Sequence, residues 1–108
     1  MRTALRAIAS PTRLEILELV RDDERASGEI AQRTGLTRPA TSQHLRIMRE
    51  AGLVEVRVQG NRRLYRARPE SLEELRAYLE GFWGGRLDTL KERAEVLHRS
   101  RQRGDEPR

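Results

Sequence analysis

The first part of the chain has apolar positions at helical spacing, interrupted by a proline. Residues 3–9 form a short helical lead. Ser10-Pro11 then predicts a helix start, because serine caps free amide groups and proline is favoured at the first helical position. The inward stripe of this second helix is Leu14, Ile16, Leu17 and Val20. A charged connection at residues 21–25 follows it.

A glycine separates the next two helical patterns. We expect Ser27 to cap the third helix, and Ile30 and Ala31 to face the core. Gly35 follows Ala31 at the spacing that a chain reversal with positive φ between two packed helices requires. Leu36 then fills the angle between the helices. This arrangement predicts a helix-turn-helix at residues 27–52.

The fourth helix starts after Thr37, another capping residue, with Pro39 in its first turn. Thr41 falls on an inward turn of this helix, where its hydroxyl can bond the preceding turn. The helix stops at Ala51-Gly52, where we expect a left-handed residue. Its apolar residues are Leu45, Ile47 and Met48.

Two alternating strands follow, at residues 53–59 and 62–68. Gly60-Asn61 supplies the positive φ values that a tight hairpin needs, and Pro69 ends the second strand. A hairpin directly after a helix-turn-helix is a wing, here residues 53–68. The predicted fold is therefore mainly α with a small β-hairpin (α+β), a winged helix-turn-helix.

A last helix is predicted from Ser71, which can form a capping box with Glu74. Its apolar seam is close to heptad spacing and longer than a small winged domain can cover, so we expect a dimerisation helix at residues 71–98. Gly81, Gly84 and Gly85 are candidate positions for a kink or break. The alternative is a helix that packs only on its own domain. The seam runs through positions 72, 75, 79, 83, 87, 90, 94 and 97.

The same pattern sets the expected domain organisation. Residues 1–99 should form a single winged helix-turn-helix DNA-binding domain. Residues 100–108 are rich in charge and lack apolar positions, so we expect a disordered tail whose arginines add nonspecific phosphate contact.

The distribution of charged residues along the chain indicates a function as well as a fold. Residues 36–68 hold eight arginines against two acids, a net charge of +6, while the whole chain carries +5. Everything outside that segment therefore sums to −1. A basic charge confined to a helix-turn-helix and its wing is typical of a protein that binds double-stranded DNA.

Composition excludes several other classes. Four aromatic residues are too few for single-strand binding by base stacking, and the absence of cysteine excludes disulfides and thiolate metal sites. Arg2, Arg6, Pro11 and Arg13 interrupt the first twenty residues, so neither a signal peptide nor a membrane span is expected. We expect a soluble cytoplasmic protein without a membrane partner.

Three segments resemble the ArsR-type (arsenic-repressor-like) winged-helix transcriptional regulators. They are PTRLEILELV, GLTRPATSQHLRIMREAGLV and RVQGNRRLYRARP, and the resemblance covers residues 3–97. It implies a homodimeric repressor that binds an inverted-repeat operator in a promoter, with its two recognition helices about 34–36 Å apart in successive major grooves. It also implies that the first and last helices form the dimer interface. The expected interface residues are Leu5, Ile8, Leu72, Leu75, Leu79, Phe82, Trp83, Leu87 and Leu90.

In such proteins the start of the recognition helix contacts base edges. We therefore expect Arg38 to pair with guanine, Gln43 with adenine, and the Ala40 methyl to contact thymine. The expected base readers are Arg38, Ala40, Thr41, Ser42 and Gln43. The expected phosphate and wing contacts are Thr37, His44, Arg46, Arg49, Arg62 and Arg63.

For some of these residues a structural interpretation stays open. Arg46 and Arg49 could instead lie on a solvated helix face. His44 matches the family's histidine, and a lone histidine is a phosphate contact or a structural partner more often than a metal ligand. Tyr65 should pack the wing against the body of the domain, with its hydroxyl at the rim.

Metal sensing, which is common among relatives of this kind, is not expected here. Residues 26–29 lack the thiolates of one family site, and the last helix offers only Asp88, Glu92, Glu95 and His98 toward the other. We therefore predict no metal and no cofactor, and leave open an unidentified small-molecule or protein effector, for instance near Phe82 and Trp83.

No catalytic motif is present either, so an enzyme is not expected. The remaining alternatives are a non-sequence-specific architectural DNA-binding protein, a metal-responsive repressor with a degenerate His/Asp/Glu site, and a winged helix used for protein interaction.

Overall fold

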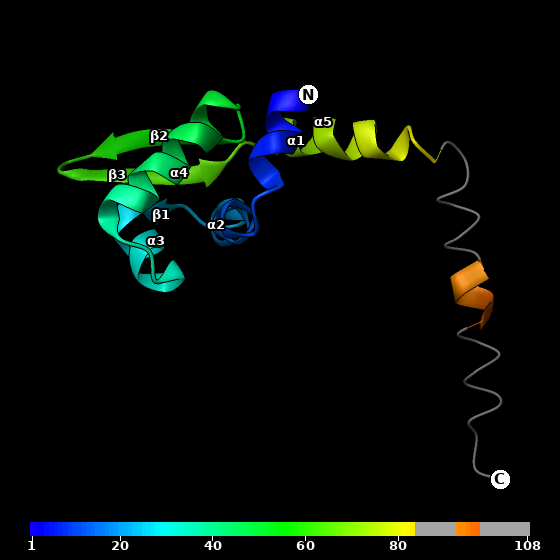
Figure 1. Cartoon of the computed structure of the whole chain (residues 1–108), viewed down its shortest axis with the longest axis horizontal. Coiled ribbons are helices and arrows are strands. Elements are labelled where there is room, and N and C mark those ends of the chain that lie inside the picture. The colour runs from blue at the N-terminus through cyan, green and yellow to red at the C-terminus, as the bar shows by residue number, and fades with distance from the viewer. Residues whose placement is uncertain (84–92, 98–108) are drawn as a thin grey trace, which may run out of the picture. The chain divides into compact units, whose positions relative to one another are not determined.

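The computed structural model describes residues 1–83 and 93–97. It confirms a mainly helical fold with a small antiparallel sheet (Figure 1). The elements are α1 (Arg2–Ile8), α2 (Pro11–Arg21), β1 (Arg25–Ala26), α3 (Ser27–Thr34), α4 (Arg38–Glu50), β2 (Val54–Gln59), β3 (Arg62–Ala67) and α5 (Pro69–Glu80). Residues 93–97 are helical as well. No helix in these two ranges is long and apolar enough to cross a bilayer.

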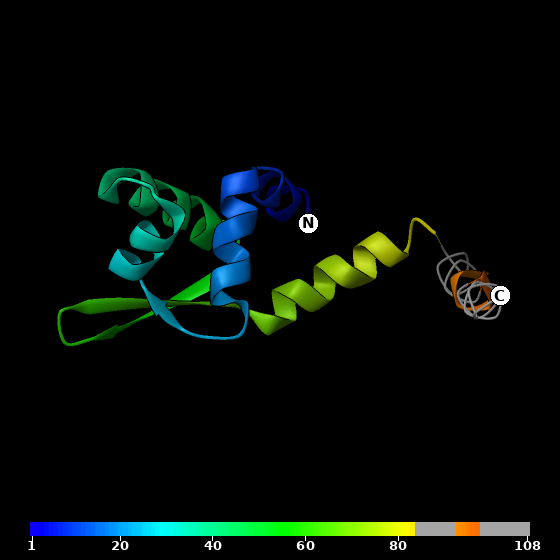
Figure 2. The same cartoon turned by 90° about the horizontal axis from the view of Figure 1, so that it is seen from below.

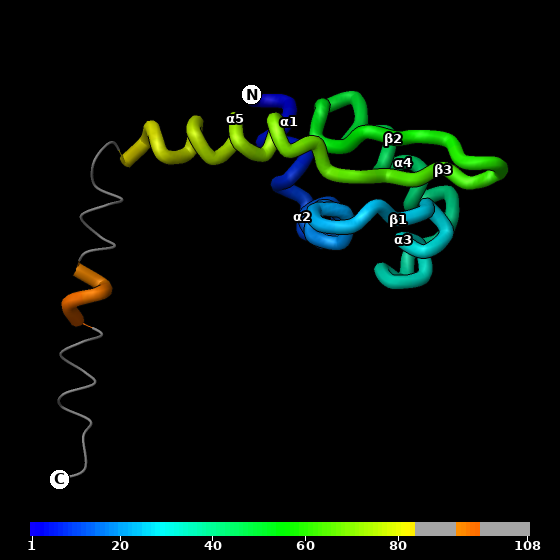
Figure 3. The backbone as a smooth tube through the Cα atoms, turned by 180° about the vertical axis from the view of Figure 1, so that it is seen from behind, coloured from blue at the N-terminus to red at the C-terminus, as the bar shows by residue number. Residues whose placement is uncertain are grey.

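The chain divides into two compact units, Met1–Arg76 and Ala77–Arg108. The first unit holds the helix-turn-helix and the wing. In it, α3 and α4 lie over one face of the hairpin β2–β3 (Figure 2), and the hairpin tip projects beyond them (Figure 3). The single domain at residues 1–99 stays a prediction.

Side-chain caps set the starts of α2 and α4. The Ser10 side chain accepts a hydrogen bond from the Arg13 amide at 3.3 Å, and Thr37 accepts one from the Ala40 amide at 3.2 Å. Gly35 ends α3 with a φ of +73°, which confirms the predicted reversal. Ser27, however, does not cap α3. It is the first helical residue, and Ala26 occupies the cap position without a side-chain bond, because Ala26 is held extended in β1.

The sheet contains one strand more than the sequence predicts. Its order is β1-β3-β2, and β1 pairs Arg25 with Tyr65 inside the segment expected to be a charged connection. In the hairpin, Gln59 pairs with Arg62 across a two-residue turn. Gly60 has a φ of +62° but Asn61 has no positive φ, so the expectation for Asn61 is wrong. A two-residue turn in which only the first residue has a positive φ is typical of type II′.

The core of the first unit contains most of the predicted inward residues. Leu14 is an exception, since it is 42% exposed on α2. Thr41 lies in the core with a relative exposure of 1%. The buried cluster is Ala7, Ile16, Leu17, Val20, Ile30, Leu45, Met48, Leu53, Val54, Tyr65, Ala67 and Leu75. Leu5, Ile8, Leu36, Ile47 and Leu72 pack against it from its margin.

Helix α5 differs from the prediction at both ends. It begins at Pro69, and the Ser71 hydroxyl donates to the Gly52 carbonyl, so the Ser71–Glu74 capping box is wrong. It ends at Glu80, and a turn at residues 81–83 begins at Gly81, the first of the three candidate break positions. Leu87, Leu90 and the tail at residues 100–108 lie outside the described residues.

Candidate nucleic-acid interface

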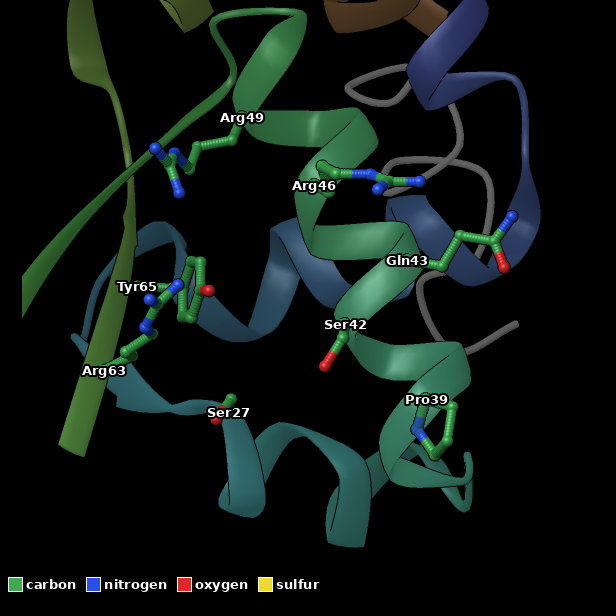
Figure 4. A pocket seen from close by; sticks show the side chains of 8 residues that line it. All are labelled: Ser27, Pro39, Ser42, Gln43, Arg46, Arg49, Arg63 and Tyr65. Carbon is green, nitrogen blue, oxygen red and sulfur yellow. The ribbon is translucent and has the colours of Figure 1, made fainter. Parts of the chain in front are cut away.

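A groove with a volume of about 560 Å³ lies between α4 and the wing, and we call it the wing groove. Helices α3 and α4 and strand β3 supply its lining, which contains three arginines and no carboxylate (Figure 4). The lining residues are Ser27, Pro39, Ser42, Gln43, Arg46, Arg49, Arg63 and Tyr65. A smaller hollow beside it is lined by Arg46, Arg49 and Glu50. The wing groove is therefore a positively charged surface with hydroxyl and amide groups.

Helical periodicity explains why α4 contributes five of these residues. Each of positions 39, 42, 43, 46 and 49 lies three or four residues from another of the set, so they share the face opposite buried Thr41, Leu45 and Met48. Within that face the side chains diverge. Ser42 and Arg49 point toward the wing, whereas Gln43 and Arg46 point away from it (Figure 4).

Strand alternation separates the two wing arginines. Arg63 lies two residues from Tyr65 in β3 and shares its face of the sheet, whereas Arg62 lies on the opposite face. Arg63 accordingly lines the wing groove and Arg62 does not. Both residues are exposed. The predicted pair of wing contacts is thus split between two faces of the hairpin.

A bidentate ion pair anchors the wing on its other side. The Arg57 guanidinium donates to both carboxylate oxygens of Glu24, at 2.7 Å from Nε and 2.6 Å from Nη2. This hydrogen bonding lowers the pKa of Glu24 below its ordinary value, and the charges of Arg57 and Arg66 add to the effect. Arg68 pairs likewise with Glu70 at 3.2 Å, so two of the eight arginines in the basic segment have an acidic partner within the chain.

Three predicted contact residues at the start of the recognition helix, Thr37, Arg38 and Ala40, lie apart from the wing groove. The Arg38 guanidinium lies against α3, where a Cβ on Gly28 would be 2.7 Å from its Nη1. Ala40 is half-buried, and Thr37 uses its side-chain oxygen as the helix cap. None of these three residues lines the groove. Their assignment as DNA contacts stays a prediction.

The burial of Thr41 contradicts its predicted role as a base reader. Its hydroxyl donates to the Thr37 carbonyl at 2.9 Å, and only 1% of the residue is exposed. This geometry confirms the inward position and the bond to the preceding turn. The assignment of Thr41 as a base reader is wrong, because its side chain faces the core and not the exposed face of α4.

His44 has a structural partner. Nη1 of Arg13 lies 3.3 Å from its Nδ1, and Nε of the same guanidinium donates to the Ala7 carbonyl at 2.6 Å. Because arginine only donates, Nδ1 is the acceptor. His44 is therefore part of a link from α1 and α2 to α4, and its role as a phosphate contact stays a prediction. Sequence reasoning missed Arg13, whose partner is 31 positions away.

Sequence reasoning also missed three residues that line the groove. Ser27 was interpreted as a cap and Tyr65 as a packing residue, although both line the wing groove. Pro39 could have been found, since it lies one helical turn before Gln43 on the same face. Among residues 1–83 and 93–97 no group of three His, Cys, Asp or Glu side chains could hold a metal ion. Asp88, Glu92 and His98 lie outside those ranges.

Comparison with known proteins decides the family. Residues 10–56 match the profile of the family described as bacterial regulatory protein, arsR family. The HTH-type transcriptional regulator Rv2034 of Mycobacterium tuberculosis is 41% identical over 80 residues, which are 74% of this chain and 75% of that protein. The chain belongs to the arsR family.

Solved structures agree with this arsR-family membership. The crystal structure of a "possible transcriptional regulator for arsenical resistance" has a TM-score of 0.70 and 39% identity, and the match covers 83% of this chain and 94% of that one. A homodimeric winged helix-turn-helix DNA-binding domain from Mycobacterium bovis has a TM-score of 0.64 and 33% identity, with 82% of each chain covered. This arsR-family protein is a winged helix-turn-helix DNA-binding transcriptional regulator.

Proposed function

We propose that this protein is a homodimeric repressor that binds an inverted-repeat operator in a promoter. The observation that carries the proposal is the wing groove, where Arg46, Arg49 and Arg63 line one surface beside the exposed face of the recognition helix. Duplex DNA presents closely spaced phosphates on both sides of its major groove, and such an arginine-lined surface matches them. The proposal includes no catalytic role, and the cytoplasm, where a bacterial chromosome lies, is the site of action that it implies.

Direct base reading is assigned to the side of α4 that points away from the wing. Gln43 is exposed there and can pair bidentately with adenine, and Arg46 lies beside it. Arg46 therefore joins the candidate base readers, although the sequence favoured a phosphate contact. Ser42 and Arg49 point toward the wing and suit phosphate contacts. Arg38 would read guanine after leaving its place against Gly28.

Dimerisation is assigned to α1 and to the apolar positions of α5 and the turn that follows it. Leu79, Phe82 and Trp83 are exposed by 38%, 68% and 41% in the single chain, which favours their burial against a second copy. The homodimeric relative from Mycobacterium bovis supports the same assembly. Two recognition helices would then enter successive major grooves about 34–36 Å apart.

An effector remains a separate part of the proposal. Ala77, Tyr78, Gly81 and Phe82 line a largely apolar hollow of about 360 Å³, and the rings of Tyr78 and Phe82 meet edge to face at 5.2 Å. An apolar small molecule or an apolar side chain of a partner protein suits this hollow. Neither is required for operator binding.

Binding-site selection from a random duplex library with the purified protein tests the proposal. We expect a palindromic motif, bound roughly 10³-fold more tightly than random duplex. If the dimer neutralises six to eight phosphates, the logarithm of its affinity should fall with the logarithm of salt at a slope of roughly −5 to −7. Tight binding without a motif would identify an architectural protein, and a flat salt dependence would exclude DNA binding of this kind.

A further inference from the structure

One hydroxyl group in the wing groove has no structural role. Tyr65 is 6% exposed and its ring belongs to the core cluster, a role that a phenylalanine ring would fill equally well. Within the part of the chain that the structure describes, the phenol makes no hydrogen bond, and no fully enclosed side-chain polar atom lacks a partner. The hydroxyl therefore reaches the wing groove, and Figure 4 shows its oxygen directed toward α4.

The neighbours of that hydroxyl are hydrogen-bond donors. Ser27 and Ser42 contribute hydroxyl groups, and Arg49 and Arg63 contribute guanidinium groups on the wing side of the groove. The lining of the wing groove contains no acid, and Glu50 lines the adjoining hollow instead. A ligand that satisfies this set must offer several acceptor oxygens and a negative charge.

The N-terminus of α3 adds to the same preference. Ser27 is its first helical residue, and the cap residue Ala26 offers no side-chain acceptor to the free amides. Glu29 in the first turn is engaged elsewhere, because its carboxylate pairs with Arg25 at 3.1 Å and Arg33 at 3.5 Å. Free amides and the helix dipole favour an anion at this end of α3.

We propose that the wing side of this groove seats one phosphodiester group of the DNA backbone, with the Tyr65 hydroxyl donating to a phosphate oxygen. Arg63 and Arg49 balance the charge, and Ser27 and Ser42 contribute the remaining donors. This inference rests on the proposed operator binding. It assigns Tyr65 a positioning role, because a phosphate held by α3, α4 and the wing together fixes the recognition helix in the major groove without reading a base.

Tyr65→Phe is the direct test, since it keeps the ring in the core and removes only the hydroxyl. We expect affinity to fall roughly five- to tenfold, by the same factor on the selected operator and on random duplex. Thr12→Val is the matched control, since it removes a hydroxyl from α2 outside the lining of the wing groove, and it should leave affinity unchanged. Urea unfolding of both variants checks that the fold is retained.

A scan with neutral methylphosphonate linkages then locates the contact. At one linkage in each half-site, the neutral group should weaken binding of the native protein about five- to tenfold more than binding of Tyr65→Phe, because the hydroxyl bond is already lost in the variant whereas the arginine contacts are present in both. Equal affinity of Tyr65→Phe and the native protein would overturn the inference, as would a scan in which every linkage affects both proteins alike. Native protein that neither selects an operator nor responds to salt would instead overturn the proposed function.

Inorganic phosphate distinguishes the DNA backbone from a free anion. It is titrated at constant ionic strength while the amide signals of Ser27 and Gly28 are followed by NMR. We expect no saturable shift at low millimolar concentration. Free phosphate lacks the other DNA contacts to α4 that hold a backbone phosphate in this position. A saturable shift that is lost in Tyr65→Phe, together with displacement of the operator by phosphate, would overturn the assignment to a backbone phosphodiester.

Discussion

The guanidinium of Arg13 joins the recognition helix to the N-terminal helices, since its Nη1 lies 3.3 Å from Nδ1 of His44. Nε of the same group donates to the carbonyl of Ala7, near the end of α1. One side chain at the start of α2 thus contacts both α1, a proposed dimerisation element, and α4, the proposed DNA-reading element. A change in the position of α1 has a direct physical route to α4.

Arg13→Lys should therefore destabilise the fold despite conserving charge. A single ammonium group cannot reproduce the geometry of a guanidinium that bonds the Ala7 carbonyl and the His44 ring at once. We expect a loss of about 1–2 kcal/mol in the free energy of unfolding, measured by urea denaturation. Arg2→Lys, on exposed α1 surface, is the control and should have almost no effect. Equal stability of the two variants would show that the link contributes nothing.

The ion pair between Glu24 and Arg57 should make stability depend on acid. The pKa of Glu24 is lowered, first by the hydrogen bond from Arg57, so its unfolded value of about 4.5 lies above the folded value. The contribution is therefore complete above pH 4.5 and is lost as the pH falls through the folded value. Glu24→Gln should destabilise the protein at pH 7 and match the native protein in acid, as followed by urea unfolding from pH 7 to pH ~2.5.

Glu55→Gln provides the comparison for that experiment, since Glu55 lies on β2 with Arg57 and makes no ion pair in the described part of the chain. Its effect should be smaller than that of Glu24→Gln at pH 7. A difference between native protein and Glu24→Gln that stays constant over the whole pH range would contradict the role of the carboxylate.

Thr41→Val should leave base preference unchanged, in contrast to Gln43→Ala. The valine keeps the shape of the buried side chain, and the lost hydroxyl bonded only the Thr37 carbonyl, which already accepts the Thr41 amide. We expect a stability change within about 1 kcal/mol. Gln43→Ala should relax preference at one base position by about 1–3 kcal/mol. Repeating the binding-site selection with each variant measures both effects, and a changed motif for Thr41→Val would restore Thr41 as a base reader.

Arg63→Ala and Arg62→Ala test the two faces of the hairpin. Both variants remove one positive charge from neighbouring positions, so general electrostatic attraction changes equally. Only Arg63 lines the wing groove. Arg63→Ala should lower affinity for all sequences and reduce the salt slope by roughly one per protomer, whereas Arg62→Ala should change the slope less. Titrations at several salt concentrations compare them, and identical slopes would contradict the separation of the two side chains.

Local chemistry explains what the sequence could predict. Ser10 and Thr37 accept from amides three residues further along, and Gly35 acts through its own φ, so these residue types predict helix ends without tertiary information. The winged helix-turn-helix followed from such positions together with apolar spacing. The charge of residues 36–68 indicated DNA binding before any geometry was known.

Tertiary contacts explain what the sequence could not predict. Strand β1 has two residues, too few to show a period, and it exists because β3 has a free edge for Arg25 and Ala26. Ser71 bonds the carbonyl of Gly52 and not its own helix. The wing groove unites residues from three elements, and the pairing that brings Tyr65 beside Ser27 depends on the register of β1 with β3.

The exposed apolar side chains of Tyr78, Leu79, Phe82 and Trp83 affect how operator occupancy depends on the concentration of this protein in the cell. If a second copy covers them, only the paired form occupies the operator. At low protein concentration the number of pairs rises with the square of the number of chains. Halving the chains in a growing cell then lowers the number of pairs by about fourfold. Dilution by growth alone would release the promoter over a narrow range of protein abundance, without any signalling molecule.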